Sequence, residues 1–312
     1  MATTSPAATL LFAHGGGFCK QIWEPIIRRM RASPLLQTRG VRTDFVSFDF
    51  LYHGSKRDES VAPQLDLDGP GGPRVRHPAQ DLVSWTTEEM RQQVRAIREK
   101  HRGDEPKPAL IGIGHSMGAG AMWNTEVQDP GTFDALILFE PVYGAPSREA
   151  GDKVSDFLVS LTLQRESSWP SRAAAEEHFA NFKNFAGWDR EALAAYLQGA
   201  LVEDETTGTT VLACHPHIEA SLYCHKILFF SDQELPRAKC PVRFHSGDRS
   251  NMFFKPFFED AVAKHPEIYS IGEPMAKCSH LMVLEKPDMA AAKVLDDLAM
   301  MAPFRQHLPS RI

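Results

Sequence analysis

A serine stands between two glycines in the run Gly114-His115-Ser116-Met117-Gly118. This spacing is typical of a nucleophilic serine on a tight turn between a strand and a helix, because the flanking glycines remove the Cβ atoms that would clash there. Apolar residues 109–113 precede the run and small residues 118–121 follow it, which favours a buried strand and a closely packed helix. We therefore predict that Ser116 is a nucleophile; a buried turn serine without chemistry is the alternative.

A glycine-rich turn follows the first apolar stretch. The run His14-Gly15-Gly16-Gly17 comes directly after residues 8–13, and such a turn can direct backbone N–H groups at the developing negative oxygen of a reacting carbonyl. We expect Gly16 and Met117 to donate to that oxygen, with Gly17 as a further donor; an ordinary glycine turn is the alternative. The side chains expected to contact the substrate are those of His14, Phe18, His115 and Tyr143.

A histidine near the C-terminus is needed as the base for Ser116. In α/β sheets that carry a nucleophilic serine on such a turn, the chain order is serine, acid, histidine, and the loop after the last strand returns over the serine. His280 follows the last expected strand, whereas His265 precedes that strand and His307 lies in the tail. We therefore predict that His280 is the general base.

Two carboxylates are candidates for the acid that orients His280. Asp248 follows the apolar stretch 242–245, and Glu140 ends the stretch 135–139, the one after the serine run. Both positions lie at the carboxyl end of an expected strand, the edge at which parallel sheets build their sites. Position and residue type leave both assignments open.

Short apolar stretches that alternate with helical patterns must position these side chains. This alternation predicts a doubly wound, mainly parallel α/β sheet with crossover helices. We expect residues 1–144 and 236–312 to form this core. Residues 145–235 carry helical patterns but no convincing core strand, so we expect an inserted helical cap there. The expected strands cover residues 8–13, 45–49, 109–113, 135–139, 242–245 and 268–271, and two expected helices cover 81–101 and 288–300.

Composition excludes several classes of partner. The 312 residues carry a net charge of −6, so the chain lacks the basic surplus typical of a nucleic-acid binder. No apolar run approaches the roughly 18 residues of a membrane span. The five cysteines stand far apart without a Cys-x-x-Cys pair, which favours neither a zinc site nor a disulfide framework, and fits a reducing compartment. We expect no metal, no cofactor and a small-molecule substrate.

These motifs resemble the α/β-hydrolase superfamily over nearly the whole chain, including Asp49-Phe50-Leu51-Tyr52-His53-Gly54-Ser55. Residues 13–25 are similar to the opening of fungal peroxisomal hydrolases of secondary metabolism, such as the acyl-CoA hydrolase of mycophenolic acid biosynthesis and toxin-biosynthesis ester hydrolases. In the former, the acid ends the strand after the nucleophile, so the resemblance implies Glu140, with Glu where Asp is expected. Many superfamily members instead carry the acid at the position of Ser250.

The resemblance implies a serine hydrolase that cleaves an ester or an acyl-CoA thioester through an acyl-enzyme. An acyltransferase, a C–C hydrolase, a non-hydrolytic cyclase or lyase, and a non-enzymatic ligand-binding protein of the same fold are the alternatives. The C-terminal residues Ser310-Arg311-Ile312 are similar to the Ser-Lys-Leu peroxisomal address. They imply a peroxisomal import receptor as partner and a peroxisomal location, with the cytoplasm as the alternative.

Overall fold

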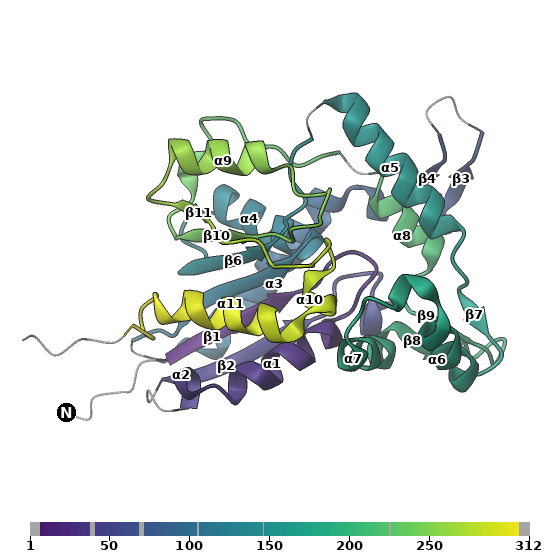
Figure 1. The fold of residues 1–312 in the computed structure, drawn as a ribbon, viewed down its shortest axis with the longest axis horizontal. Helices are drawn as coiled ribbons and strands as arrows, with labels where there is room; N and C mark the ends of the chain where they lie inside the picture. The colour runs from purple at the N-terminus through teal and green to yellow at the C-terminus, as the bar shows by residue number, and fades with distance from the viewer. Residues whose placement is uncertain are drawn as a thin grey trace, which may run out of the picture.

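The computed structural model describes residues 7–37, 41–68, 72–104, 106–145, 147–224 and 226–305. A six-stranded sheet in the order β11-β10-β6-β5-β1-β2 forms its centre (Figure 1), and all five pairings between neighbouring strands are parallel. The strands are β1 (Ala7–Ala13), β2 (Arg42–Phe48), β5 (Ala109–His115), β6 (Ala135–Phe139), β10 (Val242–His245) and β11 (Tyr269–Ile271). The predicted doubly wound α/β core is confirmed. The predicted address at residues 310–312, and His307, lie outside the described residues.

Helices cover both faces of the sheet because its side chains alternate between two apolar layers. Leu10 and Phe12 of β1 pack with α1 and α11 on one face. Leu11 and Ala13 pack with α3, α4 and α9 on the other face, and Figure 1 shows the sheet between these layers. The helices are α1 (Glu24–Arg31), α3 (Leu82–Lys100), α4 (Met117–Gln128), α9 (Lys255–Lys264) and α11 (Pro287–Ala299), so the two predicted helices are confirmed to within a residue at each end.

A mixed segment, residues 147–224, connects β6 to β10 and is called the insertion below. Its helices are α5 (Arg148–Leu163), α6 (Arg172–Asn181), α7 (Arg190–Ala200) and α8 (Pro216–Leu222). It also holds a small antiparallel sheet that the sequence did not predict, in the order β7-β9-β8, made of Ser168–Trp169, Thr210–Leu212 and Leu201–Glu203. That residues 145–235 act as a cap stays a prediction.

The segment 56–78, which follows β2, contains a short hairpin. Its strands are β3 (Gln64–Asp66) and β4 (Arg74–Arg76), and β4 lies beside α5 and α8 (Figure 1). The remaining short helical elements are η1 (Lys20–Trp23), α2 (Pro34–Gln37), η2 (Gly54–Lys56), η3 (Pro78–Gln80), η4 (Lys183–Phe185), η5 (Leu235–Arg237) and α10 (Met282–Glu285). Among the described residues, no helix is both long and apolar enough to cross a membrane. All five cysteines are free.

Candidate active site

Ser116 occupies a strained turn between β5 and α4. Its backbone has φ 52° and ψ −115°, a conformation that residues with a side chain rarely adopt. Both flanking glycines are required by close approach. A Cβ on Gly114 would lie 2.7 Å from the Cα of Ala119, and one on Gly118 would lie 2.5 Å from the carbonyl oxygen of Ala13. The turn places the hydroxyl at the carboxyl edge of the sheet.

Three side chains from separate loops meet at this edge. The Nε2 of His280 lies 3.0 Å from the Oγ of Ser116, and its Nδ1 lies 2.7 Å from the Oε2 of Glu140. Since a carboxylate only accepts, Nδ1 carries the proton and Nε2 is left to accept the serine hydroxyl. The arrangement can therefore remove a proton from Ser116 and stabilise the imidazolium that results.

Glu140 is held by two further donors. Its Oε1 accepts the N–H of Gly247 at 2.9 Å, and its Oε2 accepts the hydroxyl of Ser250 at 2.6 Å. The side chain is 1% exposed and its residue has φ 42°. Gly247 lies against the loop of His280, because a Cβ there would be 2.3 Å from the carbonyl oxygen of Cys278. The loop after β10 therefore fixes both the carboxylate and the histidine loop.

Asp248, the alternative acid, has other partners. Its Oδ1 accepts the N–H of Cys278 at 3.1 Å, and its own N–H donates to the carbonyl of Met275. Among the hydrogen bonds of the described residues, none joins Asp248 to His280. The structure thus brings Glu140 to the histidine and leaves Asp248 to brace the loop before it.

The predicted donors to an oxyanion differ in whether they are free. The N–H groups of Gly16 and Met117 have no acceptor among the hydrogen bonds of the described residues. The N–H of Gly17, by contrast, donates to the Nε2 of His53 at 3.0 Å. In this conformation Gly16 and Met117 are available to a carbonyl oxygen and Gly17 is engaged. His53 belongs to the segment 49–55, and the sequence pattern of that segment did not predict that its ring accepts the N–H of Gly17.

Buried neutral histidines hold the glycine-rich turn in place. The Nδ1 of His14 lies 2.8 Å from the carbonyl oxygen of Gly15, and its Nε2 accepts the N–H of Phe50 at 3.1 Å. Burial lowers the pKa of His14 to about 3 and also lowers the pKa of His53. With both ring nitrogens used and no exposed surface, His14 offers no polar atom to a substrate here, contrary to its expected contact.

Asp49 ties the segment 49–55 to η1, the short helix that follows the glycine-rich turn. The Oδ1 of Asp49 accepts the N–H of Lys20 at 2.8 Å, and its Oδ2 accepts the N–H and the hydroxyl of Ser55 at 3.0 and 2.8 Å. These bonds lower the pKa of Asp49 against the opposing effect of its burial. The motif that resembles the superfamily therefore has a structural part in this chain.

The three other residues expected to contact substrate lie in different surroundings. His115 is buried and its Nε2 lies 2.8 Å from the carbonyl oxygen of His280; burial, aided by His280, lowers the pKa of His115 to about 3. Phe18 is half-buried, with its ring 6.0 Å from that of His115. Tyr143 packs 4.5 Å from Trp123 in the core and its hydroxyl accepts the N–H of Phe230. Phe18 thus borders the site, whereas these contacts place Tyr143 in the core.

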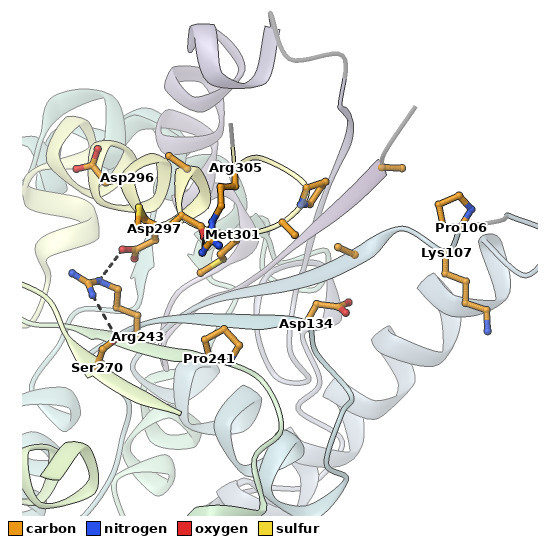
Figure 2. A pocket seen from close by; sticks show the side chains of 16 residues that line it. Pro106, Lys107, Asp134, Pro241, Arg243, Ser270, Asp296, Asp297, Met301 and Arg305 are labelled. Atoms are coloured by element: carbon orange, nitrogen blue, oxygen red, sulfur yellow. Dashed lines mark hydrogen bonds and ion pairs between the residues drawn. The ribbon is translucent and has the colours of Figure 1, made fainter. Parts of the chain in front are cut away.

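One hollow lies at the opposite edge of the sheet (Figure 2). It has a volume of about 1310 Å³ and is lined by residues at the amino ends of the strands, among them Asp134 and Arg243. Figure 2 shows Arg243 pointing toward Asp297, and its Nε lies 2.8 Å from that carboxylate. None of its lining residues belongs to the Ser116 site. Within the described ranges, no group of three or more side chains could hold a metal ion.

Comparison of the sequence with known proteins gives one family. The sequence model of the Alpha/beta hydrolase family matches residues 10–293. The abhydrolase domain-containing protein AKT2 of Alternaria alternata is 32% identical over 96 residues, 31% of this chain and 35% of that protein. The type I acyl-CoA thioesterase mpaH of Penicillium roqueforti is 29% identical over 185 residues, 59% of this chain and 37% of that protein. The matched regions thus span little more than a third of these curated relatives.

Solved structures share the fold at low identity. The peroxisomal alpha-beta-hydrolase Lpx1 of Saccharomyces cerevisiae has a TM-score of 0.73 and 16% identity, and the match covers 99% of this chain and 80% of that one. The thioesterase domain from the curacin biosynthetic pathway has a TM-score of 0.58 and 17% identity, with 94% and 91% covered. Identities this low are informative about the fold alone.

Proposed function

Because this chain belongs to the alpha/beta hydrolase family, we propose that it is a serine hydrolase that cleaves an ester or acyl-CoA thioester. The proposal depends on one observation, the relay from Ser116 Oγ through His280 to Glu140 with spacings of 3.0 and 2.7 Å. Short relays of this kind activate a hydroxyl that is a weak nucleophile by itself. The similarity to a protein named as an acyl-CoA thioesterase supports this bond class.

The proposed reaction has two halves. In the first, His280 Nε2 takes the proton of Ser116 as Oγ attacks the carbonyl carbon, and the N–H groups of Gly16 and Met117 stabilise the oxyanion. His280 then returns that proton to the departing alcohol or thiol, which leaves Ser116 acylated. In the second half, His280 takes a proton from water as its oxygen attacks the acyl carbon, and returns it to Ser116 as the acid leaves. Glu140 holds the imidazolium in both halves.

Covalent labelling tests this proposal. A fluorophosphonate should label the wild type and not Ser116→Ala, and hydrolysis of a nitrophenyl ester should fall by a factor of about 10⁴ or more in the variant. Ser84→Ala, an exposed serine on α3, is the matched control and should behave as wild type. Equal labelling of Ser116→Ala would show that the nucleophile is another residue. Product analysis with an acceptor alcohol separates hydrolysis from acyl transfer.

We also propose a peroxisomal location, on the basis of the C-terminal residues 310–312. A yeast protein of the same fold is named as peroxisomal, which is compatible with this location. A fluorescent protein fused to the N-terminus of the full chain should localise to peroxisomes, and removal of the last three residues should release it to the cytoplasm. A cytoplasmic signal from the full chain would contradict this location.

A further inference from the structure

The carboxylate of Glu219, on α8 of the insertion, lies directly against the glycine-rich turn. A Cβ on Gly17, whose φ is +75°, would fall 2.5 Å from the carboxyl carbon of Glu219. The side chain of Glu219 is 4% exposed. Only a glycine allows this approach, so Gly17 provides both the backbone conformation and the space for the carboxylate.

Two groups hold Glu219 in this position. Arg165, just beyond α5, donates through Nη1 to Oε1 at 3.1 Å and through Nη2 to Oε2 at 2.5 Å. The hydroxyl of Tyr223 donates to Oε1 at 3.0 Å. A carboxylate this buried requires such partners, and a two-point arginine contact also fixes its orientation. Glu219 is therefore a rigid group rather than a mobile surface charge.

The rest of the turn is enclosed from other directions. The N–H of Gly17 is fixed by His53, and the Nδ1 of His53 lies 2.8 Å from the carbonyl oxygen of Leu51. Leu222, also on α8, lies so close to Gly16 that a Cβ there would be 3.3 Å from its Cδ1. The free N–H of Gly16 thus sits in a turn held by the segment 49–55 on one side and α8 on the other.

We propose that Glu219, clamped by Arg165 and Tyr223, is a positioning residue that orients the Gly16 N–H toward the reacting carbonyl. The inference rests on the proposed hydrolase function and assigns to the insertion a part in transition-state stabilisation. Misplacement of a donor by about 1 Å can cost about 100-fold in rate, and loss of an oxyanion donor costs about 10²- to 10³-fold in kcat. Loosening the clamp should therefore lower kcat more than it weakens substrate binding.

Kinetics of Glu219→Gln test the proposal, because the substitution keeps the volume beside Gly17 but removes one acceptor from the arginine. We expect kcat for a nitrophenyl ester to fall by about 10- to 100-fold, with KM within about threefold. A trifluoromethyl ketone inhibitor forms a tetrahedral oxyanion on Ser116, so its affinity should fall by the same factor as kcat. The affinity of the matching secondary alcohol, which forms no oxyanion, should not change.

Glu176→Gln is the matched control. Glu176 lies in the same insertion and pairs with Arg172 at 2.9 Å on the surface of α6, so its variant should keep wild-type kcat and ketone affinity. If Glu219→Gln does not fold, Tyr223→Phe decides, because it removes one hydrogen bond and should lower kcat by about fivefold.

Two results would overturn the inference. One is wild-type kcat and ketone affinity in a folded Glu219→Gln, or in Tyr223→Phe where Glu219→Gln does not fold. The other is an equal loss of ketone and alcohol affinity, which would indicate general damage to the pocket. A wild type without esterase or thioesterase activity would instead contradict the proposed function itself.

Discussion

The hydroxyl of Ser250 donates to Glu140 at 2.6 Å, on the same carboxylate oxygen that faces His280. Ser250 occupies the position at which the superfamily often carries its acid, three residues after Gly247. In this chain the carboxylate that contacts His280 stands at the end of β6, and the loop after β10 contributes a hydroxyl that donates to it. Ser250 and His280 thus both contact the Oε2 atom of Glu140.

Substitution of the two carboxylates should have unequal effects. Glu140→Gln keeps the shape but cannot fix the Nδ1 proton of His280, so we expect kcat to fall by about 10³- to 10⁴-fold. Asp248→Asn should change kcat by less than about tenfold, because the Asp248 side chain accepts the N–H of Cys278 and has no hydrogen bond to His280 among the described residues. Steady-state kinetics on a nitrophenyl ester measure both. Comparable losses would leave Glu140 unsupported as the acid.

Removal of the Ser250 hydroxyl should lower kcat by less than Glu140→Gln and by more than Asp248→Asn. Ser250→Ala leaves Glu140 with Gly247 and His280 as partners, and one lost hydrogen bond to a charged group corresponds to about 2 kcal/mol. We expect kcat to fall by about 10- to 30-fold. Ser279→Ala, whose hydroxyl donates to Glu285 instead, is a comparison from the neighbouring loop. A wild-type kcat in Ser250→Ala would show that this hydroxyl does not support the acid.

Buried histidines should make the protein less stable in acid. The pKa of His14 and that of His115 are lowered from 6.5 to about 3 by burial, and the pKa of His53 is lowered for the same reason. Below pH 6.5 the unfolded chain therefore binds protons that the folded chain does not. The free energy of unfolding should fall as the pH drops from 6.5 toward 3, by about 1 kcal/mol per pH unit for each of His14 and His115.

Urea unfolding at pH 7.5, 6 and 5 measures this dependence. Because His115 is one of these buried histidines with a lowered pKa, His115→Gln should flatten the pH dependence of the free energy of unfolding, even if it lowers stability at pH 7.5. The same stability at pH 5 and 7.5 in the wild type would contradict the assignment of neutral, buried imidazoles.

The sequence predicted the elements whose signals are local. The glycine spacing around Ser116 describes a single turn, which the structure has between β5 and α4. Strands β6 and β10 coincide with the predicted stretches because each is a short apolar run between turns. The pairs of β7 and β8 with β9 were missed, since strands of two or three residues carry no periodicity and depend on partners far along the chain.

Contacts between loops could not be predicted from the same patterns. Gly17 was expected to be a free donor, but the ring of His53 from the loop after β2 takes its N–H. The clamp of Arg165, just beyond α5, on Glu219 of α8 joins residues 54 positions apart in the sequence. Tyr143 follows Glu140 by three residues, yet its ring packs against Trp123, because the direction of the chain after β6 depends on tertiary packing.

Replacement of Gly118, in the turn between β5 and α4, should destabilise the fold. Gly118→Ala would place a Cβ 2.5 Å from the carbonyl oxygen of Ala13 and 2.6 Å from that of His14, and neither backbone atom can move without displacing β1. Because overpacking against rigid atoms is destabilising, we expect a loss of about 3 kcal/mol or more in the free energy of unfolding. Gly103→Ala is the matched control, since a Cβ there meets nothing within 4 Å. Urea midpoints for the two variants measure the difference. Equal stability of the two variants would mean that α4 can shift away from β1 and that the turn at Ser116 is less constrained than its contacts indicate.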